Sequence, residues 1–209
     1  MKKKIVIGLG TGRCGTVSLT HLLDSQESAY VTHERPFLLP WKFDETLAKN
    51  KIEQLTSATS SFTGDVAYYY LPYVEYMIES GIDVSFVCLQ RNRFDTIRSY
   101  LRKTAGRNHW VDHDGKYWTR DPNYDKTYPS YLSSSKEQAL GFYYDEYYST
   151  AQKLQEKYPD KFKVFNTEDL NNEASVKEIL DFIGVKADQQ QIVAAIKKNV
   201  AGIDSRESS

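Results

Sequence analysis

Five short apolar runs recur along the chain, and several of them do not alternate with polar residues. Buried strands of a parallel sheet have this pattern, because helices cover both faces of the sheet. We predict strands over residues 4–9, 29–32, 61–67, 84–90 and 162–166. Between and after them, helical periodicity predicts helices over residues 16–25, 43–56, 70–80, 93–105, 134–158, 173–183 and 188–199.

The alternation of strands and helices predicts an α/β fold of three layers, with helices on both faces of a central parallel sheet. No interdomain linker or internal repeat divides residues 1–209, and their 40% apolar content is enough for one sizeable core, so we predict a single domain. Pro72 suits the first turn of its helix, and Gly81 and Gly106 suit helix ends. Residues 204–209 form a polar end that we expect to be frayed.

Residues 107–133 interrupt the regular pattern with an irregular stretch rich in tyrosine, tryptophan and proline. A stretch of this length is too long for a simple connection, so we expect a lid or one wall of a substrate site. His109 and His113 lie near Asp112 and Asp114. Because such a polar loop with a glycine is more often an ordinary loop than a metal site, we expect no metal here.

Composition and charge favour a compact protein in a reducing compartment. The 27 Lys and Arg residues balance 28 Asp and Glu residues, so no general basic surface indicates binding to nucleic acid or membranes. Cys14 and Cys88 provide no disulfide framework. The apolar run after Lys4 is too short for a signal peptide, and no run approaches the ~20 residues of a membrane helix. We therefore expect a cytoplasmic protein.

A glycine-rich turn over residues 10–15 follows the first predicted strand directly and leads into a predicted helix. Gly10, Gly12 and Gly15 allow tight bends that bring backbone N–H groups close to an anion, and the N-terminus of the helix adds its positive dipole. Arg13 adds a formal charge and a forked donor. The turn therefore predicts a phosphate-binding site.

Two common nucleotide-binding motifs share these letters. A nucleoside-triphosphate P-loop requires a lysine after its last glycine, whereas Thr16 follows Gly15, and this argues against an ATPase or a kinase. Gly10, Gly12 and Gly15 also satisfy the Gly-x-Gly-x-x-Gly fingerprint of dinucleotide-binding enzymes, and Glu34 lies near the position of a ribose-binding acid. An NAD(P)-dependent oxidoreductase therefore stays an alternative, although an arginine inside the fingerprint argues against it.

A second basic element follows the strand predicted over residues 84–90. Arg91 lies at the C-terminal end of this strand, at the edge where open α/β sheets bind ligands, and Ser99 follows on the predicted helix about two turns later. Together with the glycine-rich turn, this element resembles the sulfotransferases that use 3′-phosphoadenosine 5′-phosphosulfate (PAPS). The strand predicted over residues 162–166 and the segments after it are also similar to that family, so the resemblance spans about residues 4–185.

The resemblance implies a donor site in two parts. In the family, a loop of the form Arg/Lys-Ser/Cys/Thr-Gly-Thr-x-x-Leu holds the 5′-phosphosulfate, and an arginine and a serine with the spacing of Arg91 and Ser99 hold the 3′-phosphate. The implied donor-binding residues are Gly12, Arg13, Cys14, Gly15, Thr16, Val17, Ser18, Arg91 and Ser99.

The resemblance also implies a catalytic base in the segment after the second strand. Glu34 matches a glutamate that takes the proton from the acceptor in many members, and His33 is the neighbouring alternative. The implied reaction is in-line transfer of a sulfuryl group from PAPS to a hydroxyl or amine, with Arg13, Thr16 and Ser18 stabilising the charge on the bridging oxygen. This reaction requires no metal.

Several questions stay open at this point. The acceptor is a small molecule, a glycan or a peptide, and the sequence does not indicate an oligomeric state. A non-catalytic nucleotide-binding module is a further alternative. We interpret Asp65 as a helix cap, or alternatively as a residue that orients the acceptor. Arg93, Arg98 and Arg102 are expected to be solvated charges on a helix.

Overall fold

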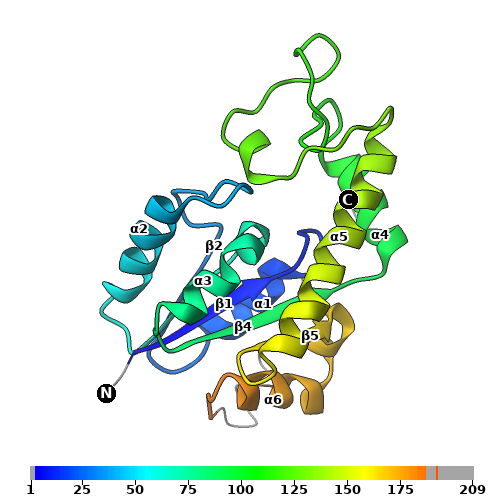
Figure 1. Cartoon of the computed structure of the whole chain (residues 1–209). Coiled ribbons are helices and arrows are strands. Elements are labelled where there is room, and N and C mark those ends of the chain that lie inside the picture. Colours follow the sequence, from blue (N-terminus) through cyan, green and yellow to red (C-terminus); the bar gives the residue numbers. More distant parts are fainter. Residues whose placement is uncertain (1–2, 187–191, 193–209) are drawn as a thin grey trace.

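The computed structural model describes residues 3–186 and residue 192, and it has the predicted α/β architecture. Within these residues, a parallel sheet has the strand order β2-β3-β1-β4-β5 (Figure 1). The strands are β1 (Lys4–Leu9), β2 (Ala29–His33), β3 (Phe62–Val66), β4 (Val84–Gln90) and β5 (Phe162–Asn166). All five strand predictions are confirmed, because continuous apolar runs of this length favour buried parallel strands.

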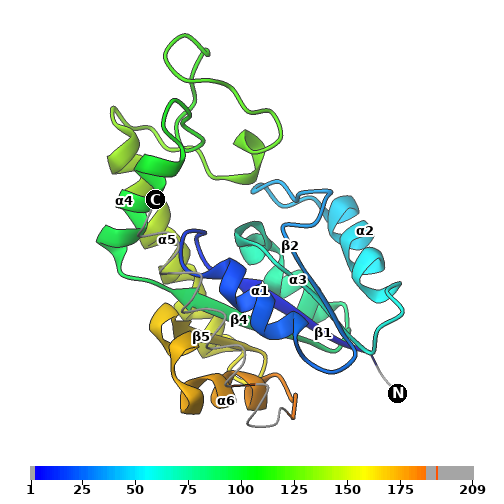
Figure 2. The ribbon, with the colours of Figure 1, turned by 180° about the vertical axis from the view of Figure 1, so that it is seen from behind.

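Helices cover both faces of the sheet, as the three-layer prediction requires (Figures 1 and 2). They are α1 (Thr16–Asp24), α2 (Glu45–Thr56), α3 (Val74–Glu79), α4 (Arg93–Lys103), α5 (Lys136–Lys157) and α6 (Glu173–Phe182). Short 3₁₀ helices are η1 (Tyr68–Tyr73), η2 (Asp125–Thr127) and η3 (Thr167–Asn171). One apolar core packs α1 and α6 against the sheet, and the other packs α2, η1, α3 and α5 against the opposite face.

The segment between β3 and β4 differs from its prediction. Instead of one helix over residues 70–80, the chain forms η1 and then α3. Pro72 lies inside η1, ahead of α3 rather than in its first turn, and its missing N–H prevents a regular α-helix through this point. Gly81 and Gly106 have φ angles of 76° and 79°, which confirms them as the left-handed residues that follow helices. The helix predicted over residues 188–199 and the frayed end over 204–209 lie outside the described residues.

Tyrosine hydroxyls of helix α5 form hydrogen bonds with the backbone of the glycine-rich turn. The Tyr147 hydroxyl accepts a hydrogen bond from the Gly10 N–H at 3.0 Å, and the Tyr143 hydroxyl donates to the Thr11 carbonyl at 3.0 Å. Tyr100 on α4 also donates to the Thr11 carbonyl. Because buried hydroxyls need partners, these side chains fix the backbone of the turn as they fill the core.

Residues 107–133 are irregular apart from η2, as predicted, and they lie beyond the C-terminal edge of the sheet (green, Figure 1). Aromatic packing anchors the segment. The fully buried Trp110 ring meets the Tyr100 ring edge-on at 5.0 Å, and Tyr128 stacks on Tyr68 at 4.3 Å.

No helix in the described part of the chain is long and apolar enough to cross a membrane.

Candidate functional site

The glycine-rich turn between β1 and α1 has an unusual backbone. Gly12, Arg13 and Gly15 have φ angles of 83°, 59° and 87°. A Cβ atom on Gly12 would clash with the Tyr100 hydroxyl oxygen, so both its conformation and its surroundings require glycine. Arg13 adopts the same left-handed region with a full side chain, at a cost on the order of 1 kcal/mol. Such strain is typical of residues that clamp a ligand.

A cavity of about 260 Å³ lies at the N-terminus of α1. Its lining comes from the glycine-rich turn, the first turn of α1, the residue after β4, and η3: Arg13, Gly15, Thr16, Val17, Ser18, Arg91, Thr167, Glu168, Leu170 and Asn171. We call it the donor cavity. Two guanidinium groups, three hydroxyl side chains and a helix N-terminus line it, and this combination binds anions.

Arg13, Arg91 and Ser99 form one continuous cluster. The Arg91 Nη1 donates to the Arg13 carbonyl at 3.2 Å, and the Arg13 Nε donates to the Ser99 hydroxyl at 3.1 Å. The family resemblance assigns Arg13 and Ser99 to opposite ends of the donor, whereas the structure places their side chains in direct contact. Ser99 is buried, does not line the donor cavity and accepts a hydrogen bond from the Arg13 guanidinium; its contact with a 3′-phosphate stays a prediction.

The side chain of Cys14 points into the core rather than into the donor cavity. It is fully buried, and burial raises the pKa of its thiol to about 11, so the thiol is neutral at physiological pH. Its backbone carbonyl accepts a hydrogen bond from the Thr167 hydroxyl at 2.8 Å.

Helix η3 contributes a wall of the donor cavity to which the sequence analysis assigned no residue. The Thr167 hydroxyl also lies 3.3 Å from the Gln90 carbonyl, so it ties the end of β4 to the glycine-rich turn. The position of Thr167 in the sequence could have predicted its place in this wall. It directly follows β5, and the C-terminal ends of parallel strands share the ligand-binding edge of the sheet.

His33 ends β2 beside the glycine-rich turn. Its Nε2 lies 3.1 Å from the Thr16 hydroxyl, so the structure brings the two predicted site residues together. Burial lowers the pKa of His33 below its ordinary value, against an opposing effect of the Asp65 charge. The imidazole is therefore neutral near pH 7.

Glu34 follows in a left-handed turn with a φ of 49°. Its carboxylate accepts a hydrogen bond from the Tyr124 hydroxyl of the 107–133 segment at 3.4 Å, and it does not line the donor cavity. Burial raises the pKa of Glu34, and the nearby Asp65 charge adds to this effect, whereas the Tyr124 hydrogen bond opposes it. The Glu34 carboxylate is thus partly desolvated and lies between the C-terminal edge of the sheet and the aromatic 107–133 segment.

The interpretation of Asp65 as a helix cap is wrong. The residue that precedes η1 is Ala67, and no side chain caps this helix. Asp65 is fully buried and accepts hydrogen bonds from the Thr32 hydroxyl at 2.8 Å, the Tyr70 hydroxyl at 2.9 Å and the Arg35 N–H at 3.2 Å. Thr32 lies on β2 and Arg35 in the turn that follows it, and both reach Asp65 because β2 and β3 are adjacent in the sheet, whereas Tyr70 lies on η1.

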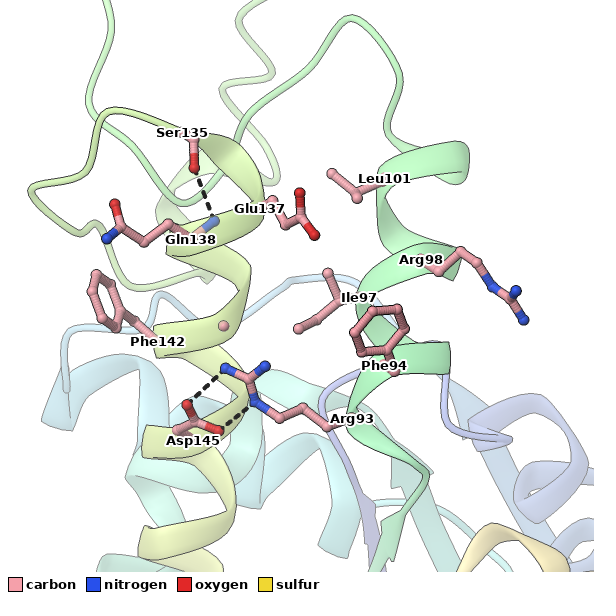
Figure 3. Close-up of a pocket in the computed structure, with 11 residues that line it drawn as sticks. Arg93, Phe94, Ile97, Arg98, Leu101, Ser135, Glu137, Gln138, Phe142 and Asp145 are labelled. Carbon is pink, nitrogen blue, oxygen red and sulfur yellow. Dashed lines mark hydrogen bonds and ion pairs between the residues drawn. The ribbon is translucent and has the colours of Figure 1, made fainter.

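A larger cavity of about 480 Å³ lies between α4 and α5 and shares no lining residue with the donor cavity (Figure 3). Arg93 spans it and pairs with both carboxylate oxygens of Asp145 at 2.8 and 2.9 Å, while Arg98 pairs with Asp95 at 2.9 Å. Arg93, Arg98 and Arg102 are exposed, which confirms them as solvated helix charges.

Of the two histidines in the 107–133 segment, His109 has a local side-chain partner, whereas the buried Nδ1 of His113 has none within the described residues. His109 Nδ1 lies 2.6 Å from the Asp125 carboxylate. Across residues 3–186 and residue 192, no group of three or more His, Cys, Asp or Glu side chains is arranged to hold a metal ion.

Comparison with solved structures yields two informative similarities. The mouse sulfotransferase SULT7A1, solved in complex with PAP, superposes with a TM-score of 0.60 at 13% identity; the match covers 95% of this chain and 63% of that one. A sulfotransferase from Alicyclobacillus acidocaldarius superposes with a TM-score of 0.52 at 15% identity, covering 98% and 95% of the two chains. This chain therefore spans less than two thirds of the length of the mouse protein.

No protein-family model matches the sequence, and no curated protein matches it. At the low identities of the two solved structures, the similarity establishes architecture. The five-stranded parallel sheet, its flanking helices and these superpositions together show that the chain has the α/β fold of the sulfotransferases.

Proposed function

We propose that this protein transfers a sulfuryl group from PAPS to a hydroxyl or amine of an acceptor. The observation that carries the proposal is the convergence of Arg13, Thr16, Ser18 and Arg91 on one cavity at the N-terminus of α1. The superposition on a sulfotransferase solved with PAP also supports it.

The donor cavity suits a ligand with several negative charges. Arg13 and Arg91 supply two guanidinium groups, Thr16 and Ser18 supply hydroxyls, and the backbone N–H groups at the start of α1 supply further donors. PAPS carries a phosphosulfate and a 3′-phosphate on the same adenosine, so it uses both arginines. A nicotinamide dinucleotide without a 2′-phosphate offers only its pyrophosphate to them, which makes it the poorer match.

The reaction divides naturally between two groups of residues. The acceptor oxygen or nitrogen forms a bond to sulfur, the bond from sulfur to the bridging phosphate oxygen breaks, and adenosine 3′,5′-bisphosphate leaves. Arg13 and the N–H groups of the turn stabilise the charge that grows on the bridging oxygen. Glu34 accepts the acceptor's proton, and His33, neutral near pH 7, is the second candidate for this role. The acceptor is a small molecule, a glycan or a peptide.

Ligand binding provides the direct test of this proposal. Adenosine 3′,5′-bisphosphate should raise the melting temperature, because a ligand that binds only the folded state stabilises it, by about 2.7 kcal/mol at a concentration of 100 Kd. Thermal unfolding should be followed with this ligand, ATP and NAD at equal concentrations. A shift from NAD that equals or exceeds that from adenosine 3′,5′-bisphosphate would contradict the donor assignment and favour an oxidoreductase.

Turnover should also depend on pH through Glu34. Since burial raises the pKa of Glu34, its carboxylate is protonated at a higher pH than the ordinary value of about 4.3, and a protonated glutamate cannot accept the acceptor's proton. We expect kcat to be constant near neutral pH and to fall as the pH drops through this raised pKa. The acidic limb should disappear in the residual activity of Glu34→Gln and persist in His33→Gln; the reverse result would assign the base to His33.

A further inference from the structure

The carboxylate of Asp65 is the centre of a buried network that the proposed reaction does not use. Besides Thr32 and Tyr70, the Tyr69 hydroxyl lies 3.4 Å from it, and the Arg35 N–H lies 3.2 and 3.3 Å from its two oxygens. The side chain has no exposed surface. A fully buried carboxylate is costly unless hydrogen bonds compensate it, so a network of this density indicates a defined task.

These contacts converge on the turn that carries Glu34. The Glu34 N–H donates to the Val66 carbonyl at 3.1 Å, which extends the pairing of β2 with β3 by one residue. The next N–H, that of Arg35, donates to Asp65. The Arg35 carbonyl then accepts a hydrogen bond from the Lys51 ammonium at 2.7 Å. Three polar backbone groups of Glu34 and Arg35 are therefore held by partners outside the turn.

The conformation of Glu34 explains why such support is needed. A glutamate with a φ of 49° is strained, and residues in this region persist only where the surrounding structure determines them. Without the Asp65 contact, the turn could relax toward an ordinary extended conformation. The Glu34 carboxylate would then leave its position beside Tyr124.

The charged and titratable groups around Asp65 come from three elements. Lys51 on α2 is buried, and burial lowers its pKa to about 8 against the opposing Asp65 charge. Arg35 and His33 lie on the β2 side, and Glu34 is the acidic neighbour whose pKa Asp65 raises. Tyr69 and Tyr70 face the carboxylate from η1. Asp65 therefore both anchors the turn and acts electrostatically on Glu34.

We propose that Asp65 is a positioning residue that holds Glu34 in its left-handed turn, the conformation from which Glu34 acts as the base. This inference rests on the proposed function, because positioning matters only if Glu34 accepts a proton. Asp65 does not contact the reacting groups itself and acts on them only through the turn.

The first test measures the turn itself and requires no activity. In Asp65→Asn, which keeps the size of the side chain but removes its charge, amide hydrogen exchange at Arg35 should accelerate by on the order of tenfold, because hydrogen bonds to an ionised acceptor are the stronger kind. The pKa of Glu34, followed by ¹³C NMR of its carboxyl carbon, should fall because the Asp65 charge raises it. Asp83→Asn, at the opposite edge of the sheet beside Lys4, is the charge-matched control and should change neither value. Unchanged Arg35 exchange together with an unchanged Glu34 pKa would overturn the inference.

A milder variant covers the case in which Asp65→Asn does not fold. Tyr70→Phe removes one hydrogen bond to the same carboxylate and leaves the turn's own residues intact. It should accelerate Arg35 exchange by a smaller factor, and no acceleration would equally overturn the inference.

The second test connects the turn to catalysis. Asp65→Asn should lower kcat by about 100-fold, the usual effect of displacing a catalytic group by about 1 Å, while the affinity for adenosine 3′,5′-bisphosphate stays the same. In a Glu34→Gln background, it should have no further effect, since a residue that acts through Glu34 cannot act twice. Additive losses would show that Asp65 works independently of Glu34. A wild-type protein that neither binds adenosine 3′,5′-bisphosphate nor transfers sulfate would refute the proposed function instead, and the exchange and NMR readouts would still report on the turn.

Discussion

Glu34→Gln should lower kcat by about 100- to 10,000-fold, the range that a positioned general base contributes. Glutamine keeps the size of the side chain and can still accept a hydrogen bond from the Tyr124 hydroxyl, but it cannot take a proton. Because Glu34 does not line the donor cavity, the affinity for adenosine 3′,5′-bisphosphate should be unchanged. Turnover with a sulfate-labelled donor and binding by calorimetry measure the two effects separately.

The control for this experiment is Glu137→Gln, which removes a carboxylate from the cavity between α4 and α5 (Figure 3). It should leave both turnover and donor affinity at wild-type values. Full activity in a folded, donor-binding Glu34→Gln variant would exclude Glu34 as the base and make His33→Gln the next experiment. A collapse of donor affinity would instead indicate that Glu34 supports the glycine-rich turn.

Arg91→Ala should weaken adenosine 3′,5′-bisphosphate by roughly 10- to 150-fold, since losing a hydrogen bond from a charged group costs about 1.5 to 3 kcal/mol. The substitution removes one guanidinium from the donor cavity together with its hydrogen bond to the Arg13 carbonyl. If Arg91 holds the 3′-phosphate, adenosine 5′-monophosphate should be affected much less. Calorimetric titration of both nucleotides measures the difference.

Arg93→Ala is the matched control, because it removes the same charge two residues away. Arg93 is exposed and pairs with Asp145 across the other cavity, so the variant should bind both nucleotides like the wild type. Equal weakening of the two nucleotides in Arg91→Ala would show that Arg91 serves the 5′ end or supports the Arg13 backbone.

Local patterns predicted most of the fold. The strands follow from uninterrupted apolar runs, and helical periodicity predicted the helix over residues 93–105. The structure adds its cap, since the Asn92 side chain accepts hydrogen bonds from the N–H groups of Phe94 and Asp95 at 2.9 and 3.2 Å. The segment around Pro72 differs from its prediction, because the prediction placed Pro72 in the first turn of a helix, where its missing N–H costs nothing, whereas the chain forms η1 through this point. The ring packing of its tyrosines stabilises η1 against the sheet.

Local sequence patterns also predicted part of the donor cavity. The glycines of the strand-to-helix turn and the arginine at the end of a later strand can be recognised in the sequence. Because parallel strands end at one edge of the sheet, these residues are expected to lie close together. The contact of Arg13 with Ser99, and the place of Thr167 in the wall, depend instead on how α4 and η3 pack around the turn. No local pattern encodes such contacts.

Local sequence thus set the elements and the chemistry of the glycine-rich turn, because both depend on residues that are neighbours in the chain. The order of the strands and their register decided the rest. Pairing of β2 with β3 places Thr32 opposite Asp65, and this register turns a residue that reads as a helix cap into the anchor of the Glu34 turn. Contacts of this kind join segments more than thirty residues apart, and their free energy arises only when tertiary packing excludes water from them.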